Sequence, residues 1–176
     1  MMGRQHLLFG IATATAFSLA TFESGLPCFE VPIIFVTGAA IGSLAPDIDT
    51  PKSMLGKCFY PISFLLNKII GHRTYTHDPI LWIPIAIVLT IKYPILFGFF
   101  FGYLGHLFLD SLTADGIPFF YFINKKLFKP LSHFLRFKAN SITAKWVTIA
   151  ISVIVISIIG LLKNVSIIFV HNNGGL

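Results

Sequence analysis

The chain has 176 residues, of which 55% are hydrophobic and only 11% are charged, and its mean hydropathy is +0.82. Soluble domains carry about 25% charged residues, so this composition excludes an ordinary soluble protein and indicates an integral membrane protein. The net charge is +6, but the basic residues lie between apolar runs, which is typical of membrane topology and of contact with lipid headgroups. We therefore expect membrane lipids as partners and no specific nucleic-acid binding.

Five apolar segments follow one another along the chain. We expect transmembrane helices over about residues 7–22, 31–45, 79–91, 94–112 and 146–170. The first resembles a signal peptide, but its many Ala and Thr residues favour a helix that stays in the protein. The third has only thirteen residues, which reach about 20 Å at ~1.5 Å per residue and are short for a hydrocarbon core of ~30 Å.

The connecting segments predict elements at the membrane surface. Residues 52–70 mix lysines with aromatic and aliphatic side chains, as an interfacial amphipathic helix does. Residues 114–144 are aromatic and basic and predict an interfacial helix or lid. The expected fold is an all-α polytopic membrane helix bundle with about five transmembrane helices and interfacial amphipathic helices. It forms a single domain over 1–176, with a motif core at 1–125, a basic interfacial segment at 126–145 and a C-terminal transmembrane helix at 146–170.

Small residues in the second and fourth segments predict close helix packing. Gly38 and Gly42 are four residues apart in the second segment, and the fourth contains Gly98, Gly102 and Gly105. This spacing lets two helix backbones approach each other in a membrane.

The distribution of Lys and Arg predicts the orientation. With five spans and the N-terminus inside, eleven of the thirteen Lys and Arg residues fall on the inner side, and only Lys92 and Lys163 fall outside. The positive-inside rule therefore favours an N-in, C-out topology. The count fails if the third and fourth segments form one re-entrant unit.

The fourth segment carries a polar face. His106, Asp110 and Thr113 share one side of a helix, at i, i+4 and i+7. Ionisable side chains in an apolar span are costly and mark functional sites. The spacing of His106 and Asp110 also presents a nitrogen and a carboxylate to one metal ion.

The predicted topology gathers further polar groups at the same, cytoplasmic side. His6 opens the first span, Asp47 and Asp49 close the second, and His72 and His77 precede the third. Imidazole and carboxylate ligands suit Zn²⁺ or another divalent first-row metal. We predict one shared metal site from His6, Asp47, His72, His77, His106 and Asp110, which would also explain how carboxylates are tolerated there.

Each motif taken alone has a simpler interpretation. His6 would be an interfacial polar group, and the Pro46–Asp49 segment a capped turn. The loop with His72 and His77 would bind anionic lipid, and His106 with Asp110 would be a neutral pair that locks helices together. The clustering of all four on one side favours the metal site. His133 and His171 are expected to be surface residues.

Four segments resemble a known family. They are residues 5–10, Pro46 to Asp49, His72 to His77, and Gly105 to Gly116. In this order they look like the YdjM/YbcI family of bacterial inner-membrane proteins, predicted metal-dependent hydrolases, over about residues 1–125. Gln5, Thr74 and Asp78 depart from the residues common in that family, but none removes a candidate ligand. The resemblance implies a multi-pass protein of the bacterial inner (cytoplasmic) membrane.

A more distant resemblance concerns the mechanism. Gly42 to Asp49 and the helix with His106 and Asp110 are similar to parts of zinc-dependent phospholipase C and the fungal zinc nucleases. The likeness implies one zinc site from Asp47, His72 or His77, His106 and Asp110, with Asp110 placed to bridge to a second metal. Nothing here matches that superfamily's later ligand segment, so only His6 and Asp49 are candidates to hold a second metal.

The leading hypothesis is a membrane-bound metal-dependent hydrolase of the esterase or phosphodiesterase type, which cleaves a lipid-like substrate at the cytoplasmic face through a metal-activated water. Asp49, if not a ligand, would be a general base or would orient a ligating histidine. Arg73 and Lys52 would pair with a phosphate, Arg73 better because of its guanidinium fork. Thr76 and Thr113 would support the site by hydrogen bonds.

The alternative is a non-catalytic membrane protein, either a metal or proton transporter or a scaffold with a structural metal. A transporter should carry polar residues near the middle of the bilayer, whereas these cluster at one edge. A structural site would be closed by four protein ligands.

Overall fold

The protein is an all-α membrane bundle. The computed structural model describes residues 3–21, 32–119, 121, 123, 125–131, 136–139 and 141–173. Its helices are α1 (Gly3–Thr21), α2 (Pro32–Gly42), α3 (Met54–Cys58), α4 (Tyr60–Ile70), α5 (Pro79–Lys92), α6 (Phe97–Ser111) and α7 (Ile142–Asn173). Three short 3-10 turns join them: η3 (Pro46–Asp49), η4 (Tyr75–His77) and η5 (Pro94–Leu96). The two-residue strands β1 (Ile117–Pro118) and β2 (Leu127–Phe128) pair antiparallel, with Ile117 opposite Phe128.

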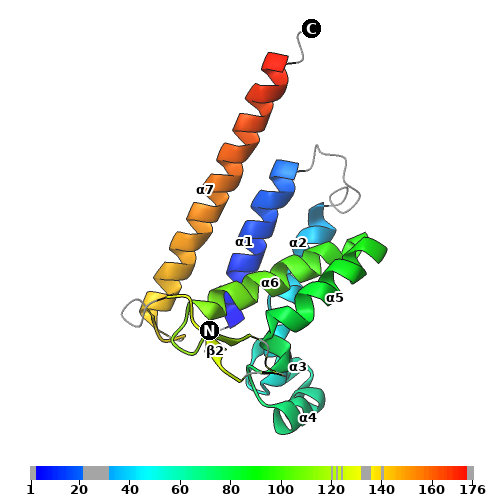
Figure 1. Ribbon diagram of the computed structural model, residues 1–176, viewed down its shortest axis with the longest axis vertical. Helices are drawn as coiled ribbons and strands as arrows, with labels where there is room; N and C mark the ends of the chain where they lie inside the picture. The colour runs from blue at the N-terminus through cyan, green and yellow to red at the C-terminus, as the bar shows by residue number, and fades with distance from the viewer. Residues whose placement is uncertain are drawn as a thin grey trace.

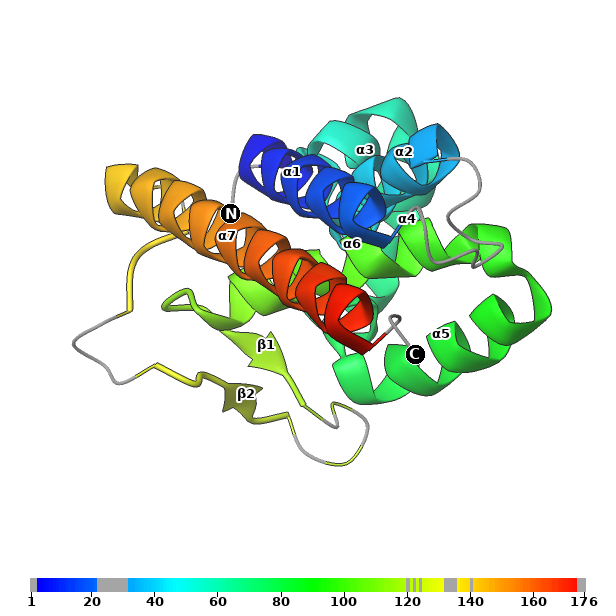
Figure 2. The same ribbon diagram turned by 90° about the horizontal axis from the view of Figure 1, so that it is seen from above.

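The long helices are not all parallel. In Figure 1, α1, α2 and α7 run along the long axis, whereas α5 and α6 lie across them. Helix α6 packs against both α1 and α2, and α7 packs against α1. Seen from above in Figure 2, α7 lies beside α1, with the β1–β2 hairpin at its other side.

The close packing of α2 on α6 follows from glycine at the contact. A Cβ at Gly102 would overlap the carbonyl oxygen of Ala39, and one at Gly98 would overlap that of Phe35. From the other helix, a Cβ at Gly42 would overlap the carbonyl oxygen of Phe99. The predicted small-residue faces therefore meet backbone to backbone, as in other membrane helix pairs.

The core beside this contact is aromatic. Ala14 and Ala39 are fully buried, and Phe35 is 2% exposed. Phe17, Phe97 and Phe101 pack against them, with ring centroids of Phe17 and Phe101 5.3 Å apart. Large rings fill the space that the small residues of α1 and α2 leave, and this fixes how far α6 lies from both.

Several helices are apolar enough to cross a membrane. Within the described residues, three segments are both long and apolar enough to do so on their own, Pro32–Asp49, Pro94–Ser111 and Ile142–Asn164. Helix α5 is apolar but has only 14 residues, and α1 has 19 residues. The first turn of α1 carries Arg4, Gln5 and His6, which lower its hydropathy. The expected helices over these two segments are present.

The connecting segments differ in how well they match the prediction. Residues 52–70 form α3 and α4, whose large apolar side chains are exposed, for example Phe64 and Ile69. This agrees with the amphipathic segment. For the interfacial helix or lid expected over 114–144, the helix is wrong, because the described residues from 114 to 141 contain the β1–β2 hairpin and no helix, and the lid stays a prediction. Pro118 in β1 and Pro130 after β2 lack the backbone N–H that a helix interior requires.

A substitution at the α2–α6 contact tests the packing. We expect Gly102→Ala to lower stability by ~1–3 kcal/mol, because its Cβ meets backbone that cannot move aside cheaply. Gly160→Ala in α7 is the control, since nothing lies within 4 Å of a Cβ there. Thermal unfolding of both variants in detergent, followed by intrinsic fluorescence, measures the effect. Equal midpoints for the two variants would contradict this account of the contact.

Candidate metal centre

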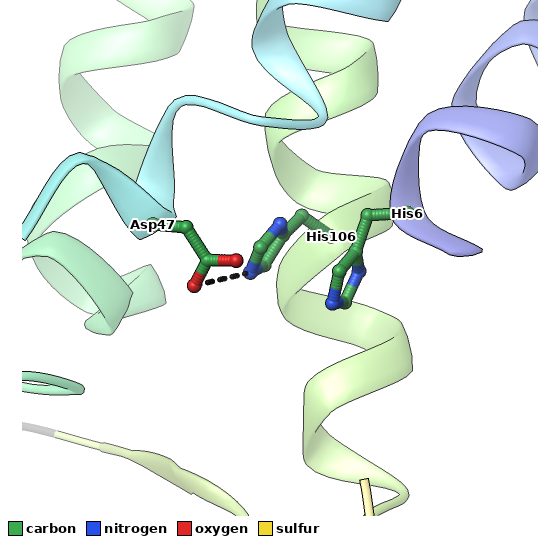
Figure 3. Close-up of side chains that lie close together, drawn as sticks. All are labelled: His6, Asp47 and His106. Atoms are coloured by element: carbon green, nitrogen blue, oxygen red, sulfur yellow. Dashed lines mark ion pairs between the residues drawn. The ribbon is translucent and has the colours of Figure 1, made fainter. Parts of the chain in front are cut away.

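Five ionisable side chains meet at the end of the bundle where α1 and α5 begin and α2 and α6 end. His6 comes from α1, His106 and Asp110 from α6, and two more from the short turns. Asp47 lies in η3 and His77 in η4. All five are buried: His6 and His77 are 0% exposed, His106 and Asp110 1%, and Asp47 9%. Figure 3 shows His6, Asp47 and His106 converging from three separate elements.

Local sequence places these groups. Helix α2 ends at Gly42, and Pro46 opens the 3-10 turn that carries Asp47 inward. After His77, the side chain of Asp78 caps α5 by accepting a hydrogen bond from the backbone N–H of Ile80 at 3.0 Å. The cap fixes where α5 starts and therefore holds His77 directly in front of it.

Four ligand-type atoms form a ring. Asp47 Oδ1 lies 3.7 Å from His77 Nε2 and 3.8 Å from His106 Nε2. On the other side, Asp110 Oδ2 lies 3.9 Å from His77 Nε2 and 3.8 Å from His106 Nε2. In a tetrahedral zinc site with bonds of about 2.1 Å, neighbouring ligand atoms are roughly 3.4 Å apart. The four distances along the ring exceed this value by a few tenths of an ångström, so these side chains are candidates to hold one ion.

His6 lies against this ring. Its imidazole stacks on that of His106, with centroids 3.6 Å apart and planes at 13°. Its Nε2 is 3.3 Å from Asp110 Oδ1, whereas the ring of four uses Asp110 Oδ2. The two oxygens of Asp110 thus face different imidazoles: Oδ1 faces His6, and Oδ2 faces His77 and His106.

Hydrogen bonds orient the two imidazoles of the ring. The Nδ1 of His106 is 2.7 Å from the carbonyl oxygen of Ser43, so Nδ1 is the donor and Nε2 presents its lone pair inward. The Nδ1 of His77 lies 3.0 Å from Thr76 Oγ1 and 3.5 Å from Asp49 Oδ2. Among the described residues, Nε2 of neither histidine has a hydrogen-bond partner. Buried nitrogens directed at one point without partners are what a metal ion would satisfy.

Asp49 organises the segment that carries His77. It is fully buried and accepts hydrogen bonds from the hydroxyl of Thr76, from the backbone N–H of Arg73 at 3.2 Å and from Thr50 Oγ1 at 3.1 Å. The Nδ1 of His72 is 2.7 Å from its Oδ1. With so many donors around it, this carboxylate holds residues 72–77 in place.

The electrostatics of His77 reflect its two carboxylate neighbours. Burial disfavours its charged form, but the nearby carboxylates of Asp47 and Asp49 outweigh burial and raise the pKa of His77. A metal ion at Nε2 would compete with a proton for the same nitrogen, so we expect metal binding to depend on pH.

Arg73 supplies a fixed positive charge beside the ring. Its Nη2 is 2.6 Å from Asp110 Oδ2, and its Nη1 is 3.1 Å from the carbonyl oxygen of Gly116. Its backbone has φ 57°, a left-handed conformation that is uncommon for a residue with a side chain. The cluster contains the buried carboxylates of Asp47, Asp49 and Asp110, and Nη1 of Arg73 also lies 3.4 Å from the exposed carboxylate of Asp115. Carboxylates therefore outnumber this one guanidinium, and a divalent cation would compensate part of the negative charge.

The structure brings most of the predicted site residues together. His6, Asp47, His77, His106 and Asp110 form three overlapping groups whose ligand atoms lie within 4.8 Å of one another, and one group includes His72 with Asp47 and His77. Of the two histidines left open by the sequence, His77 faces His106 and Asp110, whereas His72 is 38% exposed and pairs with Asp49. No group among the described residues contains both His6 and Asp49, the proposed holders of a second metal.

The remaining predicted residues surround the centre. Thr76 donates to Asp49, and Thr113 lies 3.4 Å from Arg73 Nη1. Lys52 is exposed and lines a cavity that reaches Asp47. The prediction for His133 falls outside the described residues, and so does that for the side chain of His171.

Sequence reasoning missed three supporting groups. Ser43 acts through its backbone carbonyl, which no side-chain pattern can reveal. The Asn67 side chain donates to the backbone oxygen of Asp49 at 2.8 Å, and the Tyr103 hydroxyl donates to that of Thr76. The only available signal was that Tyr103 precedes His106 by three residues, which places it near the same helix face.

The fold and this cluster define an all-α membrane protein with a buried His/Asp group that can hold a metal ion. The family model of the YdjM inner membrane protein matches residues 1–174, and the chain belongs to this family. It is 34% identical over 121 residues to the uncharacterized protein YvsG of Bacillus subtilis, covering 66% of this chain and 71% of YvsG. It is also 34% identical over 126 residues to the inner membrane protein YdjM of Escherichia coli and to that of Shigella flexneri, covering 67% of this chain.

The match spans 64% of the length of those two YdjM proteins. No solved structure matches the chain. The family, described as that of the YdjM inner membrane protein, and the apolar helices support an inner-membrane location.

Substitution of two aspartates, one in the ring and one outside it, tests whether the ring binds a metal ion. We expect purified protein to carry about one divalent ion per chain and Asp110→Asn to lose it, because the amide cannot replace the charge of this buried carboxylate. Asp115→Asn is the matched control, since Asp115 is 64% exposed. Elemental analysis after gel filtration gives the metal content, and the elution profile shows whether each variant is folded. Retained stoichiometry in folded Asp110→Asn would contradict the site.

The role of Asp49 in positioning His77 is tested by measuring the affinity of the protein for the metal ion. We expect Asp49→Asn to weaken metal binding by ~10–100-fold, as loss of an outer hydrogen-bond partner does. Asp78→Asn is the control, because Asp78 is equally buried but caps α5, and Asn caps almost as well. Competition with a fluorescent chelator measures both affinities. Equal affinities would show that Asp49 does not position His77.

Proposed function

We propose that the protein is a membrane-bound metal-dependent hydrolase that cleaves a phosphoester or related ester of a lipid-like substrate. The supporting observation is that a large cavity reaches the cluster from one side. Asp47 of the ring and the neighbouring His72 line a cavity of about 930 Å³, whereas His77, His106 and Asp110 are buried and are not among its lining residues. A catalytic metal site keeps an open position for water and substrate, whereas a structural site is closed. A cluster that reaches a large cavity on one side matches the catalytic arrangement.

The residues present fit Zn²⁺ best. Asp47, His77, His106 and Asp110 would hold it, and their nitrogen and carboxylate set suits zinc among the first-row metals. When bound, such an ion lowers the pKa of a coordinated water toward ~7 and polarises a phosphoryl or carbonyl oxygen. The proposal needs one ion, because His6 and Asp49 do not lie in a common group of potential ligands.

The chain's own residues would bind and orient the reacting groups. The guanidinium of Arg73 already contacts Asp110 and the carbonyl oxygen of Gly116. It would bind a phosphoryl oxygen by exchanging one of these partners, with the fork-like geometry that guanidinium groups favour. Asp49 would act by keeping the His77 imidazole in orientation, since its oxygens already accept several donors. This favours the orienting role over that of general base.

The orientation of the protein supports a cytoplasmic site. Most Lys and Arg residues belong to segments at the end of the bundle that carries the cluster, among them Lys52, Lys57 and Lys145. By the positive-inside rule this end would face the cytoplasm. The substrate would then come from the inner leaflet.

An activity assay with matched variants tests the function. We expect the zinc-loaded protein in detergent to hydrolyse a chromogenic phosphodiester or a phospholipid and to lose this activity with chelator. Asp47→Asn should lower turnover by more than ~100-fold, a larger loss than outer-partner substitutions cause, whereas Asp115→Asn should keep it. If the wild type binds metal at full stoichiometry and turns over none of these esters, the structural or transport alternative replaces the hydrolase.

A further inference from the structure

The large cavity lies between α1, α7 and the segment that follows η3. Its wall on α1 includes Leu8 and Ala12, and its wall on α7 includes Ile149 and Val153. Each pair is four residues apart and therefore shares one helix face. Leu8 is 65% exposed, Ile149 51% and Val153 56%, so the cavity opens to the surface that an apolar helix pair presents to lipid.

The two polar residues in the α7 wall do not make it polar. The hydroxyl of Thr148 donates to the carbonyl oxygen of Ala144 at 2.8 Å, and that of Ser152 donates to the carbonyl oxygen of Thr148 at 2.8 Å. Both hydroxyls are satisfied by their own helix. The seam between α1 and α7 is therefore suited to an apolar chain.

The same seam continues away from the metal centre. A second hollow of about 200 Å³ lies one turn further along both helices, lined by Ala16, Leu19, Ala20, Ile156, Ile159, Gly160 and Lys163. From Leu8 to Leu19 the seam is about 17 Å long at ~1.5 Å per residue, which is close to half of a ~30 Å hydrocarbon core. An apolar path of this length matches one leaflet of a bilayer.

The other end of the cavity is cationic. Arg4, Lys52, Lys57 and Lys145 line it beside Asp47 and His72, and all four basic side chains are exposed. Within the described part of the chain, none of the four forms an ion pair with a carboxylate. Four exposed positive charges without a carboxylate partner at the mouth of an apolar seam suit an anionic ligand with a hydrophobic tail.

We propose that this cavity binds an anionic phospholipid that enters sideways from the inner leaflet, with its phosphate at Arg4, Lys52, Lys57 and Lys145 and one acyl chain along the α1–α7 seam. The proposal rests on the proposed function only in identifying this lipid as the substrate. The phosphate would lie next to Asp47, the member of the metal ring that lines the cavity, so the seam would bring the headgroup to the reacting centre. Lipid binding itself requires no metal, and it is therefore testable separately.

The test measures lipid binding to full-length, chelator-treated protein, where no hydrolysis occurs. Native mass spectrometry in detergent with short-chain phosphatidic acid is the assay, and short-chain phosphatidylcholine and inorganic phosphate are the comparison ligands. We expect phosphatidic acid to bind at least ~10-fold more tightly than either, because both the charges and the seam contribute. Equal binding of phosphatidylcholine, or of inorganic phosphate, would overturn the proposal.

Two matched pairs of variants assign the site. Arg4→Gln combined with Lys145→Gln should weaken binding by at least ~10-fold, whereas Lys68→Gln, an exposed lysine of α4 outside the cavity, should not. Val153→Trp should block the seam, whereas Ile154→Trp, its outward-facing neighbour at 56% exposure, should not. Unchanged binding in both the charge and the seam variants would place the lipid elsewhere. Normal lipid binding without turnover by the zinc-loaded protein would refute the hydrolase and leave the lipid site intact.

Discussion

Burial of carboxylates at one end of an apolar bundle is the constraint on which the rest of this structure depends. Asp47, Asp49 and Asp110 are buried, and removing such groups from water costs several kcal/mol each unless charges and hydrogen bonds compensate. The protein compensates Asp49 with donors from the segment 72–77, and Asp110 with Arg73 and His6. The carboxylates still outnumber the positive charges around the ring, and its imidazole nitrogens face inward. This excess of negative charge is the physical basis for the proposed cation.

The ring exists only because α2 and α6 approach each other closely. Asp47 follows α2 by a few residues, and His106 lies one turn beyond Gly102 in α6. With glycine at the contact, the carbonyl oxygen of Ser43 reaches His106 Nδ1 at 2.7 Å and fixes the direction of its Nε2. The same small residues therefore determine both how closely α2 and α6 pack and how the ligand-type side chains at their ends are placed.

The proposed lipid cavity and the proposed metal centre lie side by side at the same end of the molecule. The aromatic and glycine-rich contact of α1, α2 and α6 closes the cluster from the bundle side, and the weaker seam between α1 and α7 leaves it open from the lipid side. Helix α7 contacts α1 but is mostly unburied, with 6% of its span buried. An enzyme that acts on a membrane lipid needs this asymmetry, because the substrate must reach the site without crossing water.

The sequence by itself determined the membrane class, the helices and the residues of the cluster, because hydropathy, glycine spacing and a His/Asp pair at i, i+4 depend only on local order along the chain. It also predicted that these residues meet at one end, since alternating spans bring the start of one helix to the end of the next. It could not choose between His72 and His77, assign the orienting contacts of Asp49, or foresee the β1–β2 hairpin in place of an interfacial helix. Nor could it show that α5 and α6 lie across the bundle or that α1 and α7 leave a seam. Only the tertiary structure decided these points, because each depends on distances between segments that are far apart in the chain.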